Sequence, residues 1–250
     1  MKAVAVYLQK GGTGKTSLSG SIAYELAKRG PTALLDFDPQ GNASSWFLTA
    51  APQHELAEAL SGAVEVAEAI TPTGTPGLDL LPTFGLDGSL KAYAENRLAD
   101  EPYICVDLVA ELSRLGYAYA VLDLSPGMGR LERAALLAAG EVITPILPEY
   151  FSLDGLETFT HELARLKKAM RTAPEHRILV VNGFDARIGQ HRTIAGQADE
   201  IAGKTVFRVP VDPAFRKAQA RHVPVQALPH DESAKEDTIT ALLGITEAIA

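Results

Sequence analysis

One stretch near the N-terminus constrains the fold most: an apolar run, then a glycine-rich loop, then a helical pattern. Residues 3–8 (AVAVYL) are rich in β-forming side chains, and residues 16–29 repeat apolar side chains at helical spacing. The loop between them contains Gly14-Lys15-Thr16. Where such a loop joins a strand to a helix, its backbone N–H groups and the positive helix end can bind phosphate.

The rest of the chain repeats this alternation of strand and helix. Further strands are predicted at residues 32–37, 78–81, 118–124, 142–147, 177–182 and 205–209. Helices are predicted at residues 56–70, 106–115, 130–139, 156–171, 192–201 and 234–250. Fully apolar strands that alternate with helices predict an α/β fold, a mostly parallel twisted sheet with helices on both faces. The Gly14-Lys15-Thr16 loop between the first strand and the first helix makes this a P-loop NTPase fold. Pro145 marks a strand end or an edge strand. Since no linker is visible, we expect residues 1–250 to form a single domain.

Composition excludes several classes of protein. The single cysteine, Cys105, rules out a disulfide framework or a cysteine-clustered metal site within one chain, and we expect it to be a buried apolar side chain. The first apolar run stops at Gln9, which is too short for a signal peptide, and no apolar stretch reaches membrane-spanning length. We therefore expect a soluble, cytoplasmic protein.

The glycine loop departs from the usual pattern G-x-x-x-x-G-K-[ST] at its first position, where this chain has Gln9. It carries extra glycines and a second lysine instead. The residues expected to bind the nucleotide here are Lys10, Gly11, Gly12, Thr13, Gly14, Lys15, Thr16 and Ser17. Lys15 is expected to reach the β- and γ-phosphates, and the Thr16 hydroxyl to bind Mg²⁺.

Two carboxylates support this interpretation. Asp38 directly follows the second predicted strand, and Asp123 lies at the end of residues 118–124. Ligands of parallel α/β sheets bind at the carboxyl ends of the strands, so both carboxylates are expected beside the loop. We expect Thr16, Asp38 and Asp123 to surround Mg²⁺, with Asp38 orienting the attacking water. Asp36 is interpreted as a residue that supports the turn.

Three segments resemble those of a known family. They are Lys10–Thr16 (KGGTGKT), Asp36–Ser44 (DFDPQGNAS) and Asp123–Gly129 (DLSPGMG). In this order they resemble the deviant Walker A motif, the segment containing switch I, and the Walker B and switch II segment of the ParA/Soj/MinD ATPases. Ile146–Leu156 and Val209–Ala218 resemble later family segments, so the likeness runs through nearly the whole chain.

The resemblance implies an ATP- and Mg²⁺-dependent homodimer with two nucleotides between its subunits. Lys10 would reach the partner's phosphates and serve catalysis together with Lys15, Asp38 and Asp123. Gly11 would be small because the two loops nearly touch. Hydrolysis would be slow until a ParB-like partner protein stimulates it. Asn182 and the turn Pro210, Val211 and Asp212 match the place where the family binds adenine; alternatively, Asn182 caps a strand end.

A basic segment raises the question of DNA. Residues 165–222 contain twelve Lys and Arg against five Asp and Glu, although the whole chain has a net charge of −8. The residues expected to contact DNA are Arg187, Arg192, Arg216, Lys217 and Arg221. Alternatively, many of these cations pair with nearby acids on a solvated face.

The sequence favours one function and leaves others open. The leading hypothesis is a nucleoid-associated ATPase that partitions plasmids or chromosomes and binds DNA without sequence preference. A positioning ATPase for a protein cargo and a MinD-like regulator of the division site are the alternatives. Residues 237–250 contain no Lys or Arg, so they lack a basic amphipathic membrane helix. The first strand begins almost at residue 1, so we do not expect an operator-binding extension before it.

Overall fold

The computed structural model describes residues 1–96, 98, 101–170, 172–201 and 203–249. Within these residues, eight strands form one sheet in the order β3-β4-β2-β5-β1-β6-β7-β8. The strands are β1 (Lys2–Val6), β2 (Thr32–Phe37), β3 (Thr71–Pro72), β4 (Leu78–Leu81), β5 (Tyr119–Leu124), β6 (Glu141–Ile146), β7 (Glu175–Phe184) and β8 (Thr205–Pro210). All neighbouring pairs are parallel except β3–β4. The predicted α/β fold with a mostly parallel sheet is confirmed.

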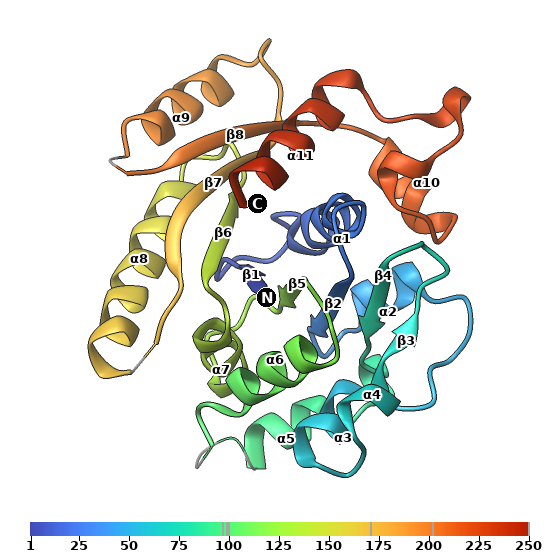
Figure 1. Cartoon of the computed structure of the whole chain (residues 1–250). Coiled ribbons are helices and arrows are strands. Elements are labelled where there is room, and N and C mark those ends of the chain that lie inside the picture. Colours follow the sequence, from blue (N-terminus) through green and yellow to red (C-terminus); the bar gives the residue numbers. More distant parts are fainter. Residues whose placement is uncertain (97, 99–100, 171, 202, 250) are drawn as a thin grey trace.

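Helices cover both faces of this sheet (Figure 1). They are α1 (Lys15–Ala27), α2 (Asn42–Phe47), α3 (Leu56–Ser61), α4 (Val66–Ala69), α5 (Leu90–Asn96), α6 (Ile104–Arg114), α7 (Arg130–Ala138), α8 (Ser152–Ala169), α9 (Gly189–Asp199), α10 (Ala214–Ala220) and α11 (Glu236–Ile249). In the part of the chain that is described, no helix combines the length and the apolar character needed to cross a bilayer.

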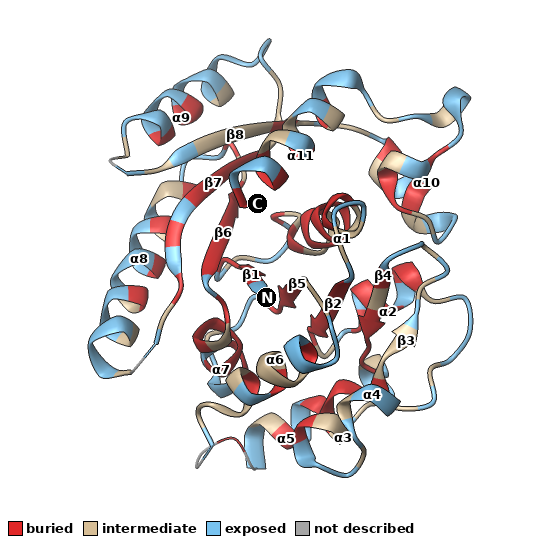
Figure 2. Ribbon diagram, viewed as in Figure 1, coloured by how far each residue is buried: buried red, intermediate tan, exposed pale blue. Residues whose placement is uncertain are grey.

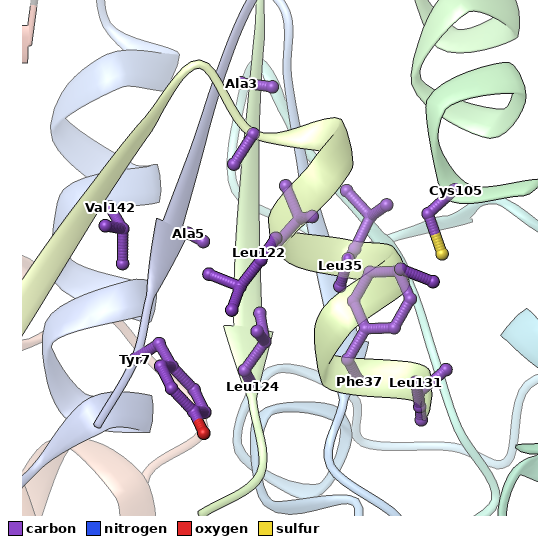
Figure 3. Packing of buried hydrophobic residues seen from close by; sticks show 14 of the residues in the cluster. Ala3, Ala5, Tyr7, Leu35, Phe37, Cys105, Leu122, Leu124, Leu131 and Val142 are labelled. Atoms are coloured by element: carbon purple, nitrogen blue, oxygen red, sulfur yellow. The ribbon is translucent and has the colours of Figure 1, made fainter. Parts of the chain in front are cut away.

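The strands divide their side chains between two hydrophobic cores, because successive residues of a strand point to opposite faces. On β1, Ala3 and Ala5 join the core under α6, α7 and α8, whereas Val4 and Val6 join the core under α1 and α11. Figure 2 shows the central strands buried and the outer helix faces exposed. Figure 3 shows the first of these cores, where Cys105 of α6 lies near Leu35 and Phe37. Cys105 is fully buried, as predicted.

The predicted strands are found within one to two residues of their expected ends, but some helices differ. The predicted helix at residues 56–70 is wrong as one unit: Gly62 adopts a left-handed φ of 70° and ends α3, and α4 follows separately. Among the strands and α-helices of the described residues, β3, α2, α5 and α10 were not predicted at all. The predicted helix ends at residues 171 and 250 lie outside the described residues.

Pro145 was predicted to mark a strand end or an edge strand. It lies near the end of β6, as the first alternative states, and β6 is an inner strand between β1 and β7. The pairing of β6 with β1 stops at Ile143, and only the pairing with β7 continues to Ile146. Pro145 therefore lies beyond the end of the β1 ladder, where its missing N–H removes no hydrogen bond to β1.

A buried histidine, His176, makes the stability of the fold depend on pH. Nε2 of His176 lies 2.9 Å from the Thr144 hydroxyl. Burial, together with the positive charges of Lys204 and Lys167, lowers the pKa of His176 to about 3. Because the unfolded chain keeps a histidine pKa near 6.5, it binds a proton that the folded chain excludes once the pH falls below that value.

We therefore expect His176 to leave the free energy of unfolding unchanged above about pH 7. Between about pH 6 and 4 it should lower this free energy by up to about 1.4 kcal/mol per pH unit. Urea unfolding at several pH values measures the slope. His176→Gln should remove this part of the slope, whereas His161→Gln, at a side chain that is 74% exposed, should not. Equal slopes in the wild type and His176→Gln would contradict the account.

Candidate functional site

The glycine loop joins the end of β1 to the start of α1 at the carboxyl edge of the sheet (Figure 1). Gly12 and Gly14 adopt left-handed φ angles of 73° and 88°, which side chains with a Cβ rarely tolerate. A Cβ on Gly14 would lie 2.1 Å from Nδ2 of Asn182, whereas a Cβ on Gly11 would meet nothing within 4 Å. The loop is therefore packed on its Asn182 side and open at Gly11.

Lys15 lies across this loop. It is 7% exposed, and its ammonium group donates a hydrogen bond of 2.8 Å to the backbone carbonyl of Lys10. Burial lowers the pKa of Lys15, and the carboxylates of Asp123 and Asp38 oppose this effect. A positive charge is thus held over the loop backbone, with carboxylates close enough to influence it.

Asp123 lies next to the start of α1. It is fully buried and accepts a 2.8 Å hydrogen bond from the Ser19 hydroxyl, and the Thr16 hydroxyl also hydrogen-bonds to it. Burial raises the pKa of Asp123, and the neighbouring carboxylate of Asp36 raises it further. Its Oδ2 atom is buried without a hydrogen-bond partner. A buried carboxylate oxygen in this state can take a cation or a proton.

Asp36 and Asp38 divide two tasks at the end of β2. Asp36 is fully buried and accepts hydrogen bonds from the backbone N–H of Ser44 at 2.8 Å and from its hydroxyl at 2.7 Å. It therefore fixes α2, in agreement with its interpretation as a residue that supports the turn. Asp38 accepts a 2.9 Å hydrogen bond from the backbone N–H of Gln40 and stays 9% exposed, beside Lys15.

These residues fit a nucleotide with a divalent cation better than a metal ion bound by protein alone. Among the described residues, no three His, Cys, Asp or Glu side chains gather to hold a metal ion. Mg²⁺, however, usually takes one or two carboxylates, phosphate oxygens and waters. The unpartnered Oδ2 of Asp123 and the nearby Thr16 hydroxyl suit that mode of binding.

Lys10 differs from Lys15 in both position and partner. Its ammonium group lies 2.7 Å from a carboxylate oxygen of Glu149, and its side chain is 35% exposed. Glu149 follows β6 and precedes Tyr150 and Phe151, which are 76% and 77% exposed. Within one chain, the second lysine of the loop is therefore held at the surface by an ion pair with a residue that precedes two exposed aromatic side chains.

The segment that follows β5 is tied to the loop that follows β1. The Tyr7 hydroxyl donates a hydrogen bond to the carbonyl of Gly127. Glu132 accepts hydrogen bonds from the hydroxyl of Ser125 and, at 2.8 Å, from the backbone N–H of Gly129. Movement of this segment would therefore displace the hydrogen-bond partner of Tyr7, which lies just before the glycine loop.

The residues expected near adenine divide into two groups. Asn182 contacts the glycine loop, because its Nδ2 donates a 2.7 Å hydrogen bond to the carbonyl of Thr13. Asp212 accepts hydrogen bonds from the backbone N–H groups of Ala214 and Lys235, at 3.0 and 2.8 Å, so it supports its own turn. Pro210 ends β8, and Val211 is 55% exposed. A contact of these residues with a base stays a prediction.

The basic residues expected to contact DNA lie in two places, near α9 and on α10, which Figure 1 shows at opposite sides of the molecule. Arg187 forms an ion pair with Asp185 at 2.6 Å, and Arg221 forms one with Glu232 at 2.6 Å. Arg192 donates a 2.6 Å hydrogen bond to a backbone carbonyl. The alternative of local pairing thus holds for Arg187 and Arg221, whereas exposed Arg216 and Lys217 on α10 stay the better candidates for DNA.

Sequence reasoning missed three residues that shape this site. Ser19 binds Asp123, Ser44 binds Asp36, and Glu149 binds Lys10. Ser19 lies four positions after Lys15, so the helical period places it on the same face of α1. Glu149 follows a strand that neighbours β1, so its loop had to lie at the same sheet edge. Ser44 gave no such signal, because α2 was not predicted.

Fold and site together define a P-loop protein, and comparisons with known proteins identify its family. Residues 1–175 match the family model described as an AAA domain. Protein BBD21 of Borreliella burgdorferi is 34% identical over 197 residues, which cover 76% of this chain and 78% of the relative. The chromosome partitioning protein ParA of Caulobacter vibrioides is 28% identical over 224 residues, which cover 88% of this chain and 84% of ParA.

A solved structure agrees with these sequence matches. Apo McdA from Cyanothece shares the fold with a TM-score of 0.87 at 18% sequence identity, over the full length of both chains. The chain belongs to the AAA domain family, as one of its ParA/MinD-type P-loop ATPases.

Proposed function

We propose that this protein is a partition ATPase: it binds ATP, dimerises, and in that state binds DNA without sequence preference. The observation that carries the proposal is the gathering of Lys15, Asp38 and Asp123 around a glycine loop that carries a second lysine, Lys10. The name of the Caulobacter relative, a chromosome partitioning protein, supports the cellular role.

The roles proposed for single residues follow from their positions. The ammonium group of Lys15 turns from the Lys10 carbonyl to the β- and γ-phosphates. Thr16, Asp38 and Asp123 would hold Mg²⁺ directly or through water, and the bound ion would neutralise charge that develops on the phosphates. Asp38 orients the attacking water. Asn182 and the Pro210–Asp212 turn contact the base.

The second lysine acts in a dimer. In the proposed homodimer, Lys10 leaves Glu149 and reaches the phosphates bound by the other subunit. A positive charge supplied from the partner stabilises the transferring phosphoryl group, as an arginine finger does. The open space at Gly11 lets two loops approach each other closely. Tyr150 and Phe151 directly follow Glu149, the partner of Lys10, and their exposed rings suit the apolar part of the same interface.

The ion pair between Lys10 and Glu149 should restrain this transfer. An exposed pair contributes at most about 1 kcal/mol, so Glu149→Ala should change the free energy of unfolding by less than that. Release of Lys10 should raise the rate of ATP hydrolysis by up to roughly fivefold. Glu157→Ala, at an exposed carboxylate that lies on α8, is the matched control and should leave the rate unchanged. A lower rate in Glu149→Ala would contradict a restraining role.

A ParB-like partner protein and the nucleoid complete the proposal. The ATP dimer would coat nucleoid DNA in the cytoplasm, and the partner on the cargo would trigger hydrolysis. A second candidate, a positioning ATPase whose cargo is a protein assembly, is favoured by one observation: Arg187 and Arg221 already pair with acids of their own chain. Such a protein needs a weaker surface for the phosphates of DNA than a DNA-partitioning ATPase does. A MinD-like role would require binding to a membrane.

DNA binding decides between these functions. Anisotropy of a fluorescent random-sequence DNA duplex is measured with ATP, with ADP and without nucleotide, at rising salt. We expect binding with ATP alone, falling steeply with salt. Arg216→Glu with Lys217→Glu should weaken it, and Arg114→Glu on distant α6 should not. Binding that ignores the nucleotide, or no binding with ATP, would overturn the partition proposal; binding of anionic vesicles by the ATP form instead would favour the MinD-like role.

A further inference from the structure

A groove lies between α7 and the C-terminal half of α8. It borders the core under α6, α7 and α8, on the face of the sheet opposite to α1. It encloses about 290 Å³, and its apolar lining includes Met128, Leu137, Leu166 and Met170. In Figure 1, α8 lies to the left of β6 and β7, and α7 lies below β6. None of the residues 10–17 of the glycine loop lines it. The groove is therefore separate from the nucleotide site described above.

The rim of this groove is positively charged. Among the described residues that line it, Arg130, Arg133 and Arg165 face a single carboxylate, Glu162. Glu162 accepts a 2.9 Å hydrogen bond from Arg165 and lies 3.9 Å from Arg133, so two guanidinium groups share it. The Arg130 guanidinium donates to the backbone carbonyl of Glu95 at 3.2 Å. The described lining residues thus place three cations around one anion, which leaves unbalanced positive charge beside an apolar floor.

The lining and the rim together indicate the chemistry of an occupant. Methionine side chains adapt to varied apolar partners, and Met128 and Met170 lie on two different walls of the groove. Arginine favours carboxylates through paired hydrogen bonds. An apolar floor does not suit the charged backbone of DNA. We propose that this groove binds an acidic peptide segment of a partner protein, with apolar side chains on the floor and Asp or Glu side chains on the rim.

The position of Met128 connects the groove to the nucleotide site. Its sulfur lies 3.4 Å from the Tyr7 hydroxyl, which also donates to the carbonyl of Gly127. An occupant that touches Met128 therefore contacts the segment between Asp123 and α7, and through Tyr7 the start of the glycine loop. This part of the inference rests on the proposed function: a bound peptide would change the rate of ATP hydrolysis by moving this segment.

The methionines give a direct measurement of binding. The chain has 3 methionines, Met1, Met128 and Met170, so methyl-labelled methionine gives two NMR signals from the groove and one internal control. The probe is a synthetic peptide of about 14 residues with Leu at helical i, i+3, i+4 and i+7 spacing and Glu beside them. A matched peptide carries Lys in place of Glu. Titration without nucleotide keeps the result independent of ATPase activity.

We expect the acidic peptide to shift the signals of Met128 and Met170 together and saturably, and to leave that of Met1 in place. Arg165→Glu, at a side chain that is 79% exposed, should weaken binding roughly tenfold. Ala169→Trp, at an exposed position that lines the groove, should block binding, whereas Ala164→Trp on the outer face of α8 should not.

Several outcomes would overturn the proposal. They are unmoved groove signals, equal shifts with the lysine peptide, or shifts that persist in Ala169→Trp. Shifts that depend on protein concentration without peptide would assign the groove to a second copy of this chain instead. If the peptide binds but does not change ATP hydrolysis, the docking site stands and the coupling through Met128 is wrong.

Discussion

Lys15→Ala is expected to lower the rate of ATP hydrolysis by roughly 100- to 1,000-fold and to weaken nucleotide binding. The reason is geometric: the ammonium group of Lys15 is held over the glycine loop by the carbonyl of Lys10, 2.8 Å away. Without it, the phosphates would face the carboxylates of Asp38 and Asp123 with no positive charge from the loop's own subunit. Phosphate release and the fluorescence of a labelled ATP analogue measure the two effects.

Lys91→Ala is the matched control for this prediction, because Lys91 is an exposed lysine on α5. It should leave both measurements unchanged. Thermal unfolding of Lys15→Ala shows whether a loss of activity reflects a loss of fold. A folded Lys15→Ala protein that hydrolyses ATP at the wild-type rate would contradict the proposed role of this lysine.

Lys10→Ala is expected to have a different signature. Its rate of hydrolysis should fall by roughly 10³- to 10⁵-fold, as when an arginine finger is removed. Nucleotide binding by the single chain should change little, because Lys10 points to Glu149 rather than into its own loop. The free energy of unfolding should change by less than about 1 kcal/mol, since the lost ion pair is exposed. Comparable losses of binding in Lys10→Ala and Lys15→Ala would contradict this division of roles.

The sequence predicted the parts of the site that depend on local pattern. A strand, a glycine loop and a helix in series placed Lys15 and Thr16, and the positions of Asp38 and Asp123 after β-strands placed them at the same edge. Parallel strands alone are enough for this, because their carboxyl ends meet at one edge of the sheet. The paired register of Asp36 and Asp123 on β2 and β5 confirms it.

Other features depend on contacts between distant segments and gave no local signal. The Lys10–Glu149 ion pair joins residues 139 positions apart, and the Tyr7–Gly127 hydrogen bond joins residues 120 positions apart. The short helix α2 has no helical period of its own to detect; Asp36 holds it through Ser44. The break at Gly62 was missed because apolar periodicity continues on both sides of it.

The central claim is that Lys10 of one subunit serves the nucleotide of the other, and mixed variants test it most directly. Lys10→Ala keeps Asp38, and Asp38→Asn keeps Lys10, so each variant alone should be inactive. In a mixed dimer, the nucleotide bound by the Lys10→Ala chain has its own Asp38 and receives Lys10 from the other chain. Equal mixing should therefore restore roughly a quarter of the wild-type hydrolysis rate, because random pairing in a two-fold dimer makes one such site in four. A mixture that stays as inactive as the separate variants would contradict the account.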